Sequence, residues 1–145
     1  MIDALTDEQL PEAPGVRAVS LAFLGLPERE VLQMATIYGL VEFATAVKPR
    51  LLTRLLEETE QASYLDPDTY VTSPMVELPV DLAATEGGIL LTPHYLAPVD
   101  GEGELGEGPL LQVGFYNLDF CAVDRRARAL LDWGWGDLEW ACLWD

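Results

Sequence analysis

The apolar residues in the first half of the chain recur with a helical period. Residues 28–47 are apolar on most sides, and Pro27 followed by acidic residues is typical of a helix N-terminus. We therefore predict a central helix over residues 28–47 that Pro49 ends or kinks. A second, amphipathic helix is predicted over residues 50–64, with one apolar stripe formed by Leu51, Leu52, Leu55 and Leu56.

After residue 75 the period of the pattern changes to two. Apolar residues at positions 76, 78, 80 and 82 alternate with Glu77, Pro79 and Asp81. This alternation predicts a half-buried strand, and Pro79 places that strand at a sheet edge because proline cannot donate to the ladder.

Two further strands are predicted over residues 89–97 and 111–122. In the second of these strands the apolar residues share one face up to Phe115 and the opposite face from Leu118 on. This change of face predicts a bulge near Asn117. The connection over residues 98–109 has four glycines and four acids, so it is predicted to be a flexible hairpin loop.

The two ends of the chain are less regular. Residues 16–26 are predicted to form a buried strand, preceded by a flexible N-terminal arm over residues 1–15. Asp124 suits the N-cap of a short helix over residues 125–133 that ends at Gly134, and the alternation from Leu138 to Trp144 predicts a last strand.

These elements predict the fold class α+β. Residues 16–145 would form a single domain in which two N-terminal helices pack on a mainly antiparallel sheet of about four to five strands, with a short C-terminal helix. A length of 145 residues fits one domain.

The acidic residues are unevenly distributed. The chain has a net charge of −17, and residues 55–124 contain fourteen carboxylates with no lysine or arginine. A folded region with one sign of charge repels itself, which costs stability. We take this cost as an indication that the concentration of acids has a functional role. It argues against direct binding of nucleic acid or an anionic membrane and favours a basic protein surface as partner. A short basic spot follows the acidic stretch at Arg125, Arg126 and Arg128, and these arginines can pair with nearby acids.

The sequence favours a cytoplasmic protein. Its most apolar segment, residues 31–47, includes a glutamate and several other polar residues, which indicates a buried helix and not a membrane span. The acidic N-terminus lacks the apolar run of a secretory signal. Cys121 and Cys142 would stay reduced inside a cell.

An enzyme is one alternative hypothesis. The hairpin could bring His94 near Cys121, as a thiolate–imidazole pair requires, with Asp119 as a third member. Against it, a catalytic cysteine needs an electropositive environment, and the surrounding sequence is acidic. We therefore predict no enzymatic activity and no catalytic residue.

No cofactor or metal site is predicted. One histidine and two separated cysteines do not complete a tetrahedral zinc site. The loop 100–107 places carboxylates at intervals, but Leu105 and Leu111 occupy the glycine and glutamate positions of an EF-hand. The Gly101-x-Gly103-x-x-Gly106 spacing opens no helix and carries carboxylates that repel phosphate.

The favoured hypothesis is a non-enzymatic acidic protein that docks on a basic surface of another protein and blocks it. Nuclease inhibitors, immunity proteins, antitoxins and phage anti-defence proteins act in this way, as charge mimics of nucleic acid. A structural or adaptor domain whose acidity reflects its habitat is the other alternative. The expected partner-binding residues are carboxylates of the edge strand and the loop, with one tryptophan anchor: Glu77, Asp81, Asp100, Glu102, Glu104, Glu107 and Trp135.

Overall fold

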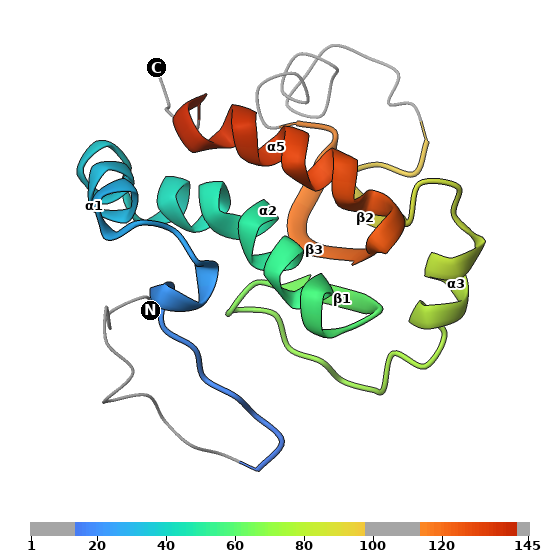
Figure 1. The fold of residues 1–145 in the computed structure, drawn as a ribbon. Helices are drawn as coiled ribbons and strands as arrows, with labels where there is room; N and C mark the ends of the chain where they lie inside the picture. Colours follow the sequence, from blue (N-terminus) through green and yellow to red (C-terminus); the bar gives the residue numbers. More distant parts are fainter. Residues whose placement is uncertain (1–13, 98–113, 142–145) are drawn as a thin grey trace. The chain divides into compact units, whose positions relative to one another are not determined.

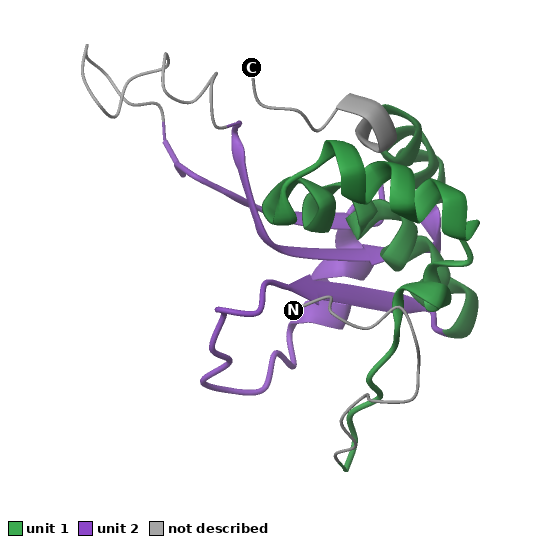
Figure 2. Cartoon of the chain, turned by 90° about the vertical axis from the view of Figure 1, so that its left-hand side faces the viewer, with its two compact units in different colours: residues 1–58, 128–145 green, residues 59–127 purple. Residues whose placement is uncertain are grey.

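The chain is an α+β protein. The computed structural model describes residues 14–97 and 114–141, and these residues contain four α-helices and one three-stranded antiparallel sheet (Figure 1). The fold class is therefore confirmed, but the described sheet has three strands where four to five were expected. The chain divides into two compact units, unit 1 (residues 1–58 and 128–145) and unit 2 (residues 59–127), which are coloured separately in Figure 2.

The described part of unit 1 contains three α-helices: α1 (Glu28–Ile37), α2 (Leu40–Glu58) and α5 (Arg128–Ala141). The helix predicted over residues 28–47 is thus two helices. The break lies at Tyr38, whose backbone is extended (φ −103°, ψ 144°) and whose side chain is buried. Tyr38 joins the apolar core of unit 1 together with Leu24, Val31, Met34, Phe43, Ala46 and Val47.

Helix α2 continues through Pro49, where the sequence predicts a helix end or a kink. Helices α2 and α5 pack side by side, as Figure 1 shows, and Pro49 is buried. A Cβ added at Gly134 of α5 would lie 3.8 Å from the Pro49 ring. Packing of the two helices therefore outweighs the low helix propensity of proline and glycine. The predicted helix end at Gly134 and the strand predicted from Leu138 are both wrong, because α5 runs to Ala141.

The strand predicted over residues 16–26 is also wrong. This segment contains a 3₁₀ helix, η2 (Leu21–Leu24), which ends at Gly25 in the left-handed conformation (φ 66°). Two arginines of α2 satisfy its carbonyls: Arg50 Nε donates to Leu24 O at 2.9 Å, and Arg54 Nε donates to Phe23 O at 3.1 Å.

Unit 2 contains the sheet, in the order β1–β3–β2. The strands are β1 (Gln61–Leu65), β2 (Ile89–Pro93) and β3 (Tyr116–Asp124), and β3 pairs antiparallel with both neighbours. Strand β1 occupies the end of the helix predicted over residues 50–64, which is therefore wrong in that part. In β3, Cys121, Ala122 and Val123 are buried, as suits a central strand.

The irregularity predicted near Asn117 is confirmed. Along β2, Leu91 pairs with Cys121 and the next residue, Thr92, pairs with Asn117, so β3 has extra residues at this point. The predicted N-cap at Asp124 is also confirmed: the Asp124 carboxylate accepts a hydrogen bond from the backbone N–H of Arg126 at 2.8 Å. A 3₁₀ turn, η3 (Arg125–Ala127), follows it.

Residues 76–82, predicted as an edge strand, instead lead into a helix, α3 (Leu78–Ala84). Leu78 and Leu82 are four residues apart, a spacing that places them on one face of a strand and also on one face of a helix. Pro79 fits this reading, because proline is favoured in the first turn of a helix. Helix α3 packs against β2 and β3 of unit 2.

Candidate functional site

Helix α3 is held by few of its own side chains. Leu82 is 1% exposed and is the only buried residue of the helix, and Leu78, one turn earlier, is half-buried. The other five residues of α3 are exposed. Most of the surface of this helix therefore faces solvent.

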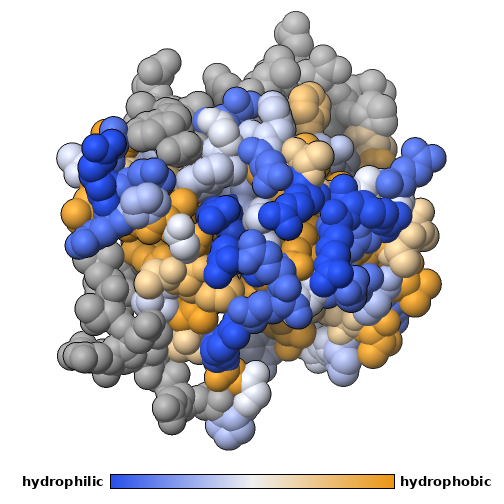
Figure 3. Space-filling model, in the orientation of Figure 1, coloured by the Kyte–Doolittle hydropathy of each residue, from blue (hydrophilic) through white to orange (hydrophobic). Residues whose placement is uncertain are grey.

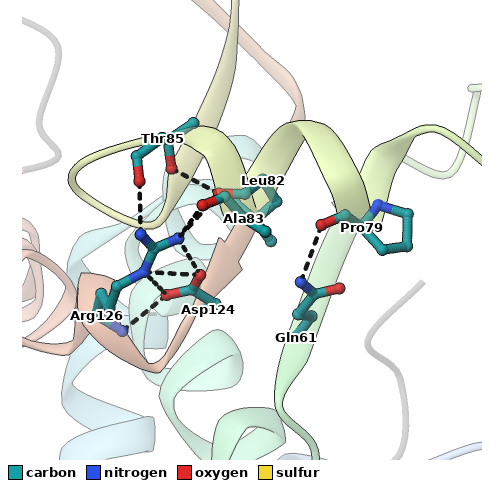
Figure 4. Close-up of polar contacts among 7 residues, drawn as sticks. All are labelled: Gln61, Pro79, Leu82, Ala83, Thr85, Asp124 and Arg126. Atoms are coloured by element: carbon teal, nitrogen blue, oxygen red, sulfur yellow. Dashed lines mark hydrogen bonds and ion pairs between the residues drawn. The ribbon is translucent and has the colours of Figure 1, made fainter.

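Side chains from the sheet and from the turn after it hold the backbone of α3, as Figure 4 shows. Gln61 Nε2 of β1 donates to the carbonyl of Pro79 at 3.3 Å. The guanidinium of Arg126 donates to the carbonyl of Thr85 at 2.6 Å and to that of Leu82 at 2.9 Å. These carbonyls lie at the C-terminal end of α3, where the helix leaves acceptors unsatisfied and where a cation is favourable.

Asp124 orients the Arg126 guanidinium. Its Oδ2 atom accepts from Nη2 at 2.6 Å and from Nε at 3.1 Å. These side-chain bonds, assisted by the backbone N–H of Arg126, lower the pKa of Asp124, although partial burial opposes that shift. The Asp124–Arg126 pair thus connects the end of β3 to the C-terminal end of α3.

Gly88 leaves the space that this pair occupies. Its φ is +67°, and a Cβ at this position would overlap Oδ1 of Asp124 and lie 2.9 Å from Cβ of Arg126. The carbonyl of Gly88 also accepts a hydrogen bond from the backbone N–H of Asp124 at 2.8 Å. Only glycine meets both the backbone conformation and the close approach here.

Two of the expected partner-binding residues lie at α3. Glu77 is the N-cap residue and Asp81 is in the first turn, and both are exposed. The expectation that they lie on an edge strand is wrong, and the correction changes their spacing. Four residues along a strand would separate them by about 13 Å, whereas residues four apart on a helix have Cβ atoms about 5–6 Å apart.

Ion pairs neutralise the first three acids of the acidic stretch. Arg17 pairs with Glu58 at 2.7 Å, Arg54 pairs with Glu57, and Arg125 pairs with Glu60 at 2.8 Å. The prediction that the basic spot at 125–128 pairs with nearby acids is confirmed. No ion-pair partner is found, within the residues that the structure describes, for five carboxylates of unit 2: Asp68, Glu77, Asp81, Glu86 and Asp119.

The other expected partner-binding residues are not brought to α3 by the described structure. Asp100, Glu102, Glu104 and Glu107 lie outside the described residues. Trp135 is on α5 in unit 1, where it is half-buried and packs against the apolar core of that unit. Trp133 on the same helix is 65% exposed.

The register of the sheet separates the candidate catalytic residues. Cys121 is buried and pairs with Tyr64 on one side and Leu91 on the other. His94 lies beyond the end of β2, and its Nδ1 is 2.9 Å from the carbonyl oxygen of Gly114. The structure therefore does not place the thiol and the imidazole on paired residues. Asp119 is exposed on β3.

Tyr64 has the most perturbed titratable side chain among the described residues. Burial raises the pKa of its hydroxyl, and hydrogen bonding to Asp66 raises it further. A phenol with a raised pKa stays protonated at neutral pH and acts as a hydrogen-bond donor. The Tyr64 hydroxyl therefore donates a hydrogen bond to the Asp66 carboxylate just after β1.

The described residues contain neither a metal-binding cluster nor a membrane-spanning helix. They contain no cluster of three or more histidine, cysteine, aspartate or glutamate residues that could hold a metal ion. No described helix combines the length and apolar character needed to cross a membrane.

Sequence reasoning missed the role of Arg126. The sequence shows Asp124 as an N-cap and Arg126 in a basic spot, but it gives no signal that the same guanidinium binds carbonyls more than forty residues earlier. In the sequence, Gly87 and Gly88 indicate only a break between two elements, although the contact of Gly88 with Asp124 requires a glycine.

Comparison with known proteins gives no independent assignment. No protein-family model matches the chain, and neither a curated protein nor a solved structure does.

Proposed function

We propose that this is a non-enzymatic acidic binding protein that docks on a basic surface of a partner protein and blocks it. The observation that carries the proposal is the pair Glu77 and Asp81. The two carboxylates lie exposed one helical turn apart on α3, and both have no ion-pair partner among the described residues.

The energetics of the helix support a role for this pair. Like charges four residues apart destabilise an isolated helix by a few tenths of a kcal/mol. The Arg126 and Gln61 contacts hold α3 despite this repulsion. A fixed pair of negative charges attracts a cationic surface without having to be ordered on binding.

The arginines of the described part of unit 2 do not screen this pair. Arg125 pairs with Glu60, and Arg126 pairs with Asp124 at 2.6 Å. The negative potential at α3 is therefore available to a partner. A nucleic-acid-binding surface is the kind of basic surface that such a charge would occupy, as nuclease inhibitors, immunity proteins and anti-defence proteins do. A cytoplasmic location fits a reduced thiol at Cys121.

Association kinetics test the proposal. A lysine-rich peptide serves as the cationic probe, and its association rate with the whole chain is measured by stopped flow at about 0.02 M and 0.2 M salt. The proposal predicts a rate that falls at least about tenfold with added salt. The double variant Glu77→Gln/Asp81→Asn should associate more slowly at low salt.

A matched control separates a local effect from net charge. Glu28→Gln/Glu30→Gln on α1 changes the charge equally but leaves α3 intact. If this control slows association as much as the α3 variant, the binding is non-specific and the proposal fails.

A further inference from the structure

The segment that leads into α3 has unusually exposed apolar side chains. All residues from 67 to 77 are exposed. Tyr70 is 86% exposed, Val76 is 71% exposed and Val80 on α3 is 70% exposed. Hydrophobic side chains are also visible at the right-hand edge of Figure 3, where Figure 1 draws α3.

The exposed valines stand beside the carboxylates. Val80 N and Asp81 N both donate to Glu77 O at 3.0 Å, so the helical path already includes Glu77. Val76 and Val80 are four residues apart, and Glu77 and Asp81 are each one position further along. Glu77 and Asp81 lie one helical turn apart and form an acidic column. Val76, in the turn before α3, and Val80, in the first turn of α3, each precede one of these carboxylates in sequence, and we call them the valine column. We call this surface, made by Val76, Glu77, Val80 and Asp81, the α3 face.

Charge decides what can cover the α3 face. A second copy of the chain would bring the same two carboxylates against it and would be repelled. The undescribed segments of the chain itself contain no lysine or arginine: residues 1–13 and 98–113 each have four acids, and residues 142–145 have one. An occupant from the chain or from a copy of it is therefore disfavoured.

We propose that the α3 face docks a cationic amphipathic segment of a partner protein, one with lysine or arginine on one side and aliphatic side chains on the other. This inference rests on the proposed function and defines the partner more narrowly. The acidic column meets the cations and steers association, whereas the valine column buries apolar surface and slows dissociation. A basic surface without apolar side chains would leave the valines uncovered.

The test compares two peptides with the same length and the same number of lysines. One has leucines at a helical spacing, and in the other these leucines are replaced by glutamine. Dissociation constants for the whole chain are measured by fluorescence anisotropy at about 0.15 M salt. We expect the leucine peptide to bind at least about tenfold more tightly.

Two variants locate the apolar contribution. Val76→Ser/Val80→Ser should remove the advantage of the leucine peptide and leave binding of the glutamine peptide unchanged. Val16→Ser/Val41→Ser, which alters two similarly exposed valines of unit 1, should retain the advantage. Circular dichroism confirms that each variant keeps its helical content.

The outcomes separate this inference from the proposed function. If the leucine peptide has no advantage, or keeps it in Val76→Ser/Val80→Ser, the amphipathic partner is wrong. In that case binding of the glutamine peptide that weakens in Glu77→Gln/Asp81→Asn still supports the acidic docking function. If neither peptide binds the wild type, both proposals fail.

Discussion

Arg126 and Asp124 form an ion pair, 2.6 Å between Nη2 and Oδ2, in which the arginine also binds the C-terminal carbonyls of α3. Asp124 is the last residue of the central strand β3 and Arg126 lies in the turn η3 that follows it, so α3 is attached to the most buried part of the sheet. This attachment gives the exposed carboxylates and valines of α3 a defined position.

Replacing Arg126 should loosen α3. Arg126→Gln removes the cation from the carbonyls of Leu82 and Thr85, and Arg126→Lys cannot reproduce the several bonds of the guanidinium. We expect faster hydrogen exchange of the α3 amides in both variants, with the larger effect for glutamine. Arg128→Gln is the control, because its 4.0 Å contact with Asp132 is exposed and lies outside unit 2. Unchanged exchange in α3 would show that the Arg126 bonds are dispensable.

The same pair predicts a pH dependence. The Arg126 bonds lower the folded-state pKa of Asp124 below its ordinary value of about 3.9. The ionised Asp124 carboxylate therefore contributes its full stabilisation of the fold at pH values above this ordinary pKa. That stabilisation is lost as the pH falls through the lowered folded-state pKa. We expect the Tm difference between the wild type and Asp124→Asn to be constant near neutral pH and to shrink below about pH 4. Thermal unfolding across this pH range measures the Tm difference. A difference that grows on acidification would contradict the stabilising role of the Asp124 carboxylate.

Gly88 should not tolerate a side chain. Gly88→Ala combines a positive φ with overlap on Asp124 and Arg126, so we expect a loss of about 1–3 kcal/mol in the free energy of unfolding. Gly87→Ala is a close control, because its Cβ would make only an ordinary 3.8 Å contact with Ile89. Urea denaturation of the two variants gives the comparison. Equal effects would mean that the contact at Gly88 relaxes without cost.

Cys121 should react slowly with alkylating reagents. It is buried on the central strand, and the register keeps it away from His94. In a Cys142→Ser background, we expect iodoacetamide at neutral pH to modify Cys121 more slowly than a free thiol, and at the free-thiol rate once the chain is unfolded in urea. A rate in the folded protein above that of the free thiol would revive the cysteine-dependent enzyme as an alternative.

The sequence was sufficient for the fold class and for local signals. The α1 start after Pro27, the Asp124 cap and the irregularity at Asn117 all depend on nearby residues, and the structure has each of them. Short-range chemistry of this kind is readable from one chain.

Errors arose where tertiary packing outweighs local propensity. Proline and glycine predicted helix ends at 49 and 134, but α2 and α5 pack together and continue. The 76–82 pattern satisfies both periods, since Leu78 and Leu82 suit either a strand or a helix. Only contact with β2 and β3 decides between them.

The candidate site was predicted in composition but not in geometry. Glu77 and Asp81 were chosen for their charge, yet their helical spacing and the valines beside them became visible only in the structure. Trp135 was chosen as an anchor, whereas it packs against the core of unit 1.

The central claim is that partners bind at the α3 face, and backbone-amide NMR of the whole chain tests it most directly. Titration with the leucine-containing lysine peptide should shift or broaden the signals of residues 76–81 first, and Glu77→Gln/Asp81→Asn should abolish those changes. Shifts that spread evenly over all acidic segments, or that leave residues 76–81 unchanged, would contradict the claim.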